Sequence, residues 1–116
     1  MPPISEWFRF VYADEDGLEE SGLTEEDLGR FEREIVADPE AGDVIQGAGG
    51  LRKYRFAPEG KGKSGAFRVC YLRYPAHGVV VVPLIYGKGQ QANLSAAEKK
   101  YFKRLADEFR RILEAE

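Results

Sequence analysis

Two segments of the chain carry apolar residues at helical spacing. In the first, Thr24 is a typical N-cap, and Asp27 stands at the third helical position, where its side chain can complete a capping box. Pro39 disfavours helical geometry in the residue before it, so this helix should end at Asp38. The second segment begins at Ser95 with the same kind of capping box. The pattern there predicts a helix whose apolar stripe consists of Tyr101, Phe102, Leu105, Phe109, Ile112 and Leu113.

Four other segments are rich in β-branched and aromatic residues and predict strands. They span residues 6–13, 51–57, 66–74 and 79–86. The last is almost entirely apolar, as expected for a central strand that is covered on both faces. Pro83 within it has no N–H to donate, which predicts a bulge or an unpaired side at that point. Between these elements, we interpret residues 14–17 as an acidic turn and residues 39–45 as a short turn of helix.

The order of these elements, β-α-β-β-β-α, predicts an α+β fold. We expect one domain over residues 1–116, in which an antiparallel sheet of about four strands packs with an N-terminal helical segment and a C-terminal helix. A chain of this length with 43% hydrophobic residues can bury a core without disulfides. It has no apolar run as long as a membrane span and no signal-peptide pattern, so we expect a cytoplasmic protein with no membrane partner.

The formal net charge of −3 conceals a strong asymmetry along the chain. Residues 1–50 contain 14 acidic and 3 basic side chains, whereas residues 51–116 contain 6 acidic and 14 basic ones. Seven of the 14 basic residues in 51–116 lie in the hairpin formed by the second and third strands, where Glu59 is the single acid. They are Arg52, Lys53, Arg55, Lys61, Lys63, Arg68 and Arg73. Such a local excess indicates an anionic partner, although a solvated hairpin whose charges discourage edge pairing has the same composition.

Side-chain alternation along the strands divides these bases between two faces. With the hairpin loop centred on its glycine- and lysine-rich middle, Arg55 lies opposite Arg68, and both share a face with Lys53. Like charges directly opposite each other destabilise a strand pair, so a fold that keeps them favours an anion site. Cys70 and Leu72 fall on this same face, which must therefore be partly covered by the C-terminal helix or by the segment before it.

The remaining chemistry-bearing residues favour structural roles. Cys70 and His77 are each the only residue of their type, which excludes a disulfide framework and argues against a cysteine-built zinc site or a Ser–His–Asp triad. The segment 62–64 resembles the end of a phosphate-binding Walker loop, but Ala57 stands where that loop needs a glycine, and a strand follows it. We therefore expect no metal and no cofactor.

Several stretches between about residues 35 and 115 resemble the RelE/HigB family of bacterial toxins. The resemblance is carried by Gly49–Phe56, Gly60–Gly65, Phe67–Tyr71, Ile85–Lys88, Asn93–Ser95 and Asp38–Ile45. Members of this family are toxins of type II toxin–antitoxin modules, and many cut mRNA in the ribosomal A site without a metal. The HigB branch pairs with an antitoxin that carries a helix-turn-helix. The resemblance thus implies a ribosome-dependent mRNA endonuclease with a HigA-like antitoxin. The alternative is a non-catalytic or ParE-like member that inhibits gyrase or only binds nucleic acid.

The same resemblance implies which residues do the chemistry. The catalytic candidates are Lys53, Arg55, Arg68, Tyr86 and Lys88, and the candidates for holding the RNA backbone are Arg52, Lys61, Lys63 and Arg73. The family's arginine and tyrosine beyond its glycine–lysine pair are replaced here by Gly89 and Ser95. Tyr86 is therefore the candidate for proton transfer, and we expect adjacent cations to lower its pKa.

Overall fold

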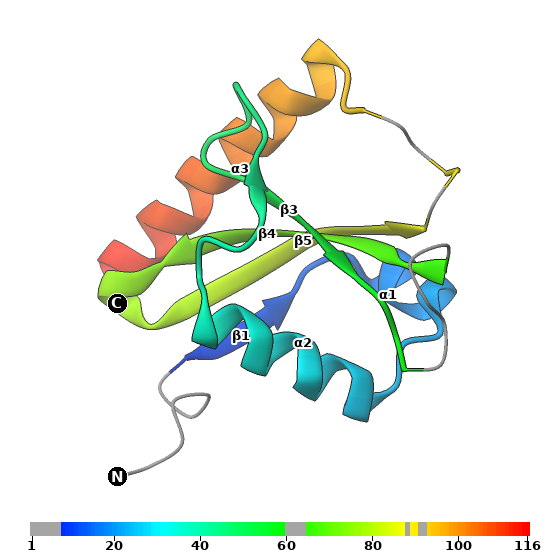
Figure 1. The fold of residues 1–116 in the computed structure, drawn as a ribbon. Helices are drawn as coiled ribbons and strands as arrows, with labels where there is room; N and C mark the ends of the chain where they lie inside the picture. Colours follow the sequence, from blue (N-terminus) through cyan, green and yellow to red (C-terminus); the bar gives the residue numbers. More distant parts are fainter. Residues whose placement is uncertain (1–7, 60–64, 88, 91–92) are drawn as a thin grey trace, which may run out of the picture.

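The computed structural model describes residues 8–59, 65–87, 89–90 and 93–116. Its elements are β1 (Arg9–Tyr12), α1 (Glu15–Ser21), α2 (Glu25–Ala37), β2 (Asp43–Val44), β3 (Arg52–Phe56), β4 (Phe67–Tyr74), the 3₁₀ helix η3 (Pro75–His77), β5 (Val79–Gly87) and α3 (Ala96–Ala115). The strands form one sheet in the order β1-β5-β4-β3-β2, and α2 and α3 lie on opposite sides of it (Figure 1). The predicted α+β class is confirmed.

The sheet is mixed and has five strands, where we expected about four antiparallel ones. β1 runs parallel to β5, with Arg9 opposite Val79, and the other pairs are antiparallel. The chain between β1 and β5 includes two helices and three strands, which leaves ample length for the crossover that a parallel pair requires. Strand composition alone does not reveal direction, so this pairing could not be read from the local pattern.

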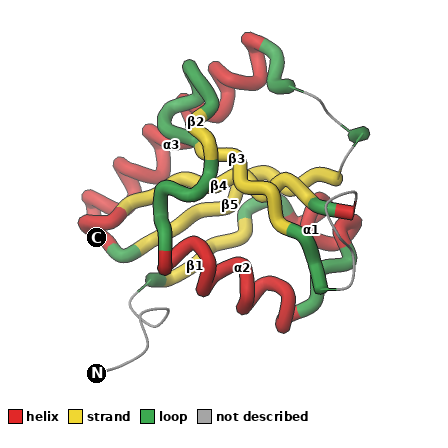
Figure 2. The backbone as a smooth tube through the Cα atoms, in the orientation of Figure 1, coloured by secondary structure: helices red, strands yellow, loops and turns green. Residues whose placement is uncertain are grey.

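The fifth strand, β2, replaces the helical turn that we expected over residues 39–45. Asp43 and Val44 pair with β3 at the edge of the sheet, and Figure 2 shows the two segments side by side. The buried hydroxyl of Tyr71 holds the preceding loop, because it donates to the Pro39 carbonyl at 2.9 Å and accepts from the Gly42 N–H at 3.0 Å. These hydrogen bonds to a residue distant in sequence override the local tendency of residues 39–45 to form a helical turn.

Residues 14–17, expected as a turn, form the cap and first turn of α1 instead. One carboxylate oxygen of Asp14 accepts from the Gly17 N–H at 3.0 Å, and the other accepts from the Ile85 N–H at 3.0 Å. The helix thereby docks against β5. Gly17 is required at this contact, because a Cβ there would lie 2.6 Å from the Ile85 carbonyl oxygen.

Replacing Asp14 with alanine should lower the free energy of unfolding by about 1–3 kcal/mol, because two backbone N–H groups lose their acceptor. Urea denaturation of the purified protein measures this change. Asp16→Ala, which removes an exposed acid from the first turn of the same helix, should cost less than about 1 kcal/mol. Equal losses in the two variants would contradict the bridging role of Asp14.

The core consists of two layers, one on each face of the sheet. On one face, Phe31 and Ile35 of α2 are buried against β3, β4 and β5. On the other face, Phe102, Ala106 and Leu113 of α3 are buried against β4 and β5. β5 is therefore covered on both sides, as its apolar sequence predicted. The expected irregularity near Pro83 is also confirmed, because the register between β4 and β5 shifts there.

α3 covers the apolar part of the face that carries the hairpin cations. Cys70 and Leu72 are buried in the same layer as the α3 side chains and Leu94, so both the C-terminal helix and the segment before it contribute to their cover. Burial raises the pKa of the Cys70 thiol to about 12, although the nearby Lys53 ammonium acts in the opposite direction. The thiol is therefore protonated and unreactive at neutral pH.

The apolar stripe of α3 differs in part from the expected one. Tyr101 and Ile112 are 52% and 53% exposed, whereas Ala106, which the stripe omitted, is buried. The reason is a close approach between α3 and the glycine-rich loop before β3. Gly49 has a φ of +72°, and a Cβ there would lie 2.9 Å from the Lys103 Cα and 3.1 Å from the Ala106 Cβ. Small residues on both sides fix which face of α3 turns inward.

Candidate functional site

The hairpin brings three basic side chains together on the face of the sheet that α3 packs against. Lys53 and Arg55 lie on β3, and Arg68 lies on β4 directly opposite Arg55, which confirms the predicted register. Together with Ala41, Asp43 and Tyr54, they line an open hollow of about 410 Å³. We call Lys53, Arg55 and Arg68 the basic cluster.

The positive charge of the basic cluster is not balanced by ion pairs with the described residues. The ion pairs found among those residues lie on α2 and α3 instead. Arg68 donates to the Ala66 carbonyl at 3.2 Å, which orients its guanidinium without neutralising it. Lys53 and Arg68 are half-buried and Arg55 is exposed. Partly buried cations that line one hollow without a neutralising acid attract an anion.

Tyr86 on β5 lies beside the basic cluster, opposite Arg68. Its side chain is buried, with 8% of its surface exposed, and it lines a second hollow of about 270 Å³ that also includes Lys53. Burial raises the pKa of Tyr86 and the neighbouring Cys70 raises it further, whereas Arg68 lowers it. The expectation that adjacent cations lower this pKa overall is therefore wrong. The hydroxyl therefore stays protonated at neutral pH.

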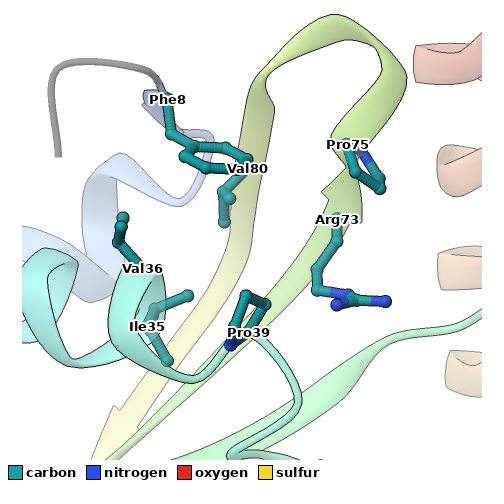
Figure 3. A pocket seen from close by; sticks show the side chains of 7 residues that line it. All are labelled: Phe8, Ile35, Val36, Pro39, Arg73, Pro75 and Val80. Carbon is teal, nitrogen blue, oxygen red and sulfur yellow. The ribbon is translucent and has the colours of Figure 1, made fainter. Parts of the chain in front are cut away.

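Two of the other basic candidates lie outside both hollows, and together they line a separate one with Arg110 of α3. Arg52 donates to the carbonyls of Glu40 at 3.2 Å and Gly42 at 2.8 Å, which ties the loop before β2 to β3. Arg73 lines a small pocket of about 50 Å³ between α2 and the sheet, shown in Figure 3. Neither residue joins the basic cluster. Lys61, Lys63 and Lys88 lie outside the described residues.

The structure adds three residues to the site that the sequence did not indicate. Lys99 near the start of α3 and Asn93 before it line the second hollow with Tyr86, and Asp43 of β2 lines both hollows. Lys99 lies on α3, where lysine and arginine side chains on a solvent-exposed helix face are common and do not indicate a site. Asp43 lies in the segment that was expected to be helical, so its position across from Lys53 was hidden.

His77 lies away from this site. It is exposed on η3 and borders a different hollow, together with the end of α3. Within the described part of the chain, no three His, Cys, Asp or Glu side chains are grouped to hold a metal ion. Of the helices in that part, none is both long enough and apolar enough to cross a membrane.

Comparison with known protein families identifies the chain. Residues 20–116 match the family described as the RelE toxin of the RelE / RelB toxin–antitoxin system. The match covers α2, α3 and all strands except β1, and it includes the basic cluster and both hollows. A toxin of this kind has an antitoxin as its partner. The chain therefore belongs to the RelE family and is the toxin of a toxin–antitoxin pair.

Proposed function

We propose that this toxin is a ribosome-dependent mRNA endonuclease, and that the basic cluster is where it acts on RNA. The observation that supports this most strongly is the convergence of Lys53, Arg55 and Arg68 without ion pairs to described acids, next to the protonated Tyr86. Phosphates of the RNA backbone are the anions that such a cluster binds best.

Cleavage of RNA needs little beyond what this site provides, because the substrate carries its own nucleophile. The ribose 2′-hydroxyl attacks the adjacent phosphorus, and negative charge builds up on the phosphate oxygens in the transition state. In the proposed mechanism, Arg68 and Lys53 stabilise that charge, while Arg55 holds the neighbouring backbone. Tyr86 gives its proton to the leaving 5′ oxygen. We propose that the reaction proceeds without a metal, because the two cations supply the positive charge.

The RNA-binding surface extends beyond these residues in the proposal. Lys99 lines the hollow next to Tyr86 and adds positive charge from α3. Lys61, Lys63 and Lys88 remain predicted contacts from the hairpin loop and from the segment after β5. Arg52 and Arg73 line neither of the two hollows, so we do not include them in this interface.

The proposed function also determines the substrate, the place of action and the antitoxin. Ribosome-bound mRNA is the substrate, so the toxin would act in the cytoplasm. The resemblance of residues 85–88 and 93–95 to the HigB branch supports an antitoxin with a helix-turn-helix.

The proposal is tested by adding the purified toxin to a bacterial translation extract and following a labelled mRNA. We expect cleavage within the translated region, and no cleavage of the same mRNA when ribosomes are removed. A parallel assay measures DNA supercoiling by gyrase. Intact mRNA together with blocked supercoiling would overturn the proposal and favour a ParE-like gyrase inhibitor.

A further inference from the structure

Asp43 is the acidic residue that lines the basic hollows. It lies on β2 directly across from Lys53 and lines both the hollow with Arg68 and the hollow with Tyr86. Its side chain is exposed, and no hydrogen bond or ion pair links its carboxylate to another described residue. The carboxylate is therefore accessible to a molecule bound in either hollow.

A carboxylate at this position is unfavourable for binding alone. It repels the phosphates that the surrounding cations attract, so it weakens the affinity of the surface for RNA. A structural explanation is available, since Asp43 and Lys53 are residues of opposite charge at directly opposite positions of two paired strands. Such a pair contributes only about 0.2–1 kcal/mol. A role in the reaction explains the carboxylate better than a role in binding does.

We propose that Asp43 is the general base that activates the ribose 2′-hydroxyl. This inference rests on the proposed function, since it concerns the same reaction. Besides Asp43, the charged and titratable groups that line the two hollows are Lys53, Tyr54, Arg55, Arg68, Tyr86 and Lys99. Four of these are lysine or arginine cations, and Tyr54 and Tyr86 both keep their protons because burial raises the pKa of each hydroxyl, so none of the six accepts a proton. Asp43 supplies the carboxylate among the described residues that line the two hollows, and a carboxylate oxygen can act as a general base.

The proposed step balances as follows. The proton of the 2′-hydroxyl moves to a carboxylate oxygen of Asp43, and the 2′ oxygen forms a bond to phosphorus. The bond from phosphorus to the 5′ oxygen breaks, and its electron pair stays on that oxygen, which takes the proton of the Tyr86 hydroxyl. The products are a 2′,3′-cyclic phosphate and a 5′-hydroxyl. Asp43 then releases its proton to water, and Tyr86 regains one from water.

The test measures single-turnover cleavage of mRNA on programmed ribosomes by Asp43→Asn. We expect the cleavage rate at saturating toxin to fall by roughly 10²–10⁴-fold, as is typical when a general base is lost. The toxin concentration needed for half-maximal rate should stay the same or decrease, because a repulsive charge is removed. Glu40→Gln, which neutralises an exposed acid of the preceding loop, is the matched control and should cleave like the wild type.

A modified substrate separates the base from the acid. When sulfur replaces the 5′ oxygen at the cleaved bond, the leaving thiolate needs no proton. This substrate should restore cleavage by Tyr86→Phe but not by Asp43→Asn.

Two outcomes overturn the inference and can be told apart. If Asp43→Asn cleaves at the wild-type rate, Asp43 has no role in the reaction, and if the sulfur substrate restores its activity, Asp43 assists the leaving group instead of the 2′-hydroxyl. In both cases the inference fails and the proposed function stands. If the wild-type toxin cleaves no mRNA on ribosomes, the proposed function fails, and the role of Asp43 fails with it.

Discussion

Arg68→Ala should lower the rate of mRNA cleavage by roughly 10²–10³-fold, which is the usual effect of removing one group that stabilises transition-state charge. Arg68 is half-buried, its guanidinium is oriented by the Ala66 carbonyl, and it lies opposite both Arg55 and Tyr86. It is therefore the cation with the most fixed position in the basic cluster. The measurement is single-turnover cleavage on programmed ribosomes at saturating toxin.

The loss of activity should come without a loss of stability. Arg55 and Arg68 face each other across two strands, and removing one of two opposed like charges relieves repulsion. The free energy of unfolding of Arg68→Ala should thus equal or slightly exceed that of the wild type. Arg111→Ala removes an exposed arginine from the far end of α3, and its cleavage rate should not change. A similar decrease in both variants would show that cleavage depends on overall charge rather than on this cluster.

Phe31→Ala should lower the free energy of unfolding by about 3–5 kcal/mol, as expected when a large aromatic side chain is removed from a core. Phe31 is fully buried on α2, and its ring lies 5.9–6.5 Å from the rings of Phe10, Tyr54, Phe56 and Tyr71. Truncation therefore leaves a cavity among four other aromatic rings. Urea denaturation, with the slope compared between variants, measures the change.

Tyr101→Ala is the matched control for this effect. Tyr101 is an aromatic residue of similar size on α3, but it is half exposed and contacts one ring, that of Phe102 at 5.1 Å. Its loss should cost about 1 kcal/mol or less. If Phe31→Ala were no more destabilising than this control, the aromatic packing between α2 and the sheet would not contribute to stability as argued.

The parts of the fold that could be predicted from the sequence are those set by local chemistry. The N-caps at Thr24 and Ser95 are confirmed, because a capping box forms within four consecutive residues. The hairpin register is confirmed, because alternation and a central loop determine which residues face each other. β2 and the parallel direction of β1 could not be predicted, since they depend on partners elsewhere in the chain. Arg9 pairs with Val79, for example, across most of the sequence.

The features of the candidate site likewise separate into those that local sequence predicts and those that depend on the tertiary structure. Charge and alternation placed Lys53, Arg55 and Arg68 on one face, as the structure shows. The pKa of Tyr86 could not be predicted, because the sequence reveals the nearby cations but not the burial that outweighs them. Lys99 comes from an element distant in sequence, so only the tertiary structure brings it to the site.

The most direct test of the account is the chemistry of the cut ends of the mRNA. If the ribose 2′-hydroxyl is the nucleophile at the basic cluster, the upstream fragment carries a 2′,3′-cyclic phosphate and the downstream fragment a 5′-hydroxyl. An mRNA with a single 2′-deoxyribose before the cleaved bond should then remain intact at that site. Fragments with 3′-hydroxyl and 5′-phosphate ends, or cleavage after the deoxyribose at the normal rate, would contradict the account.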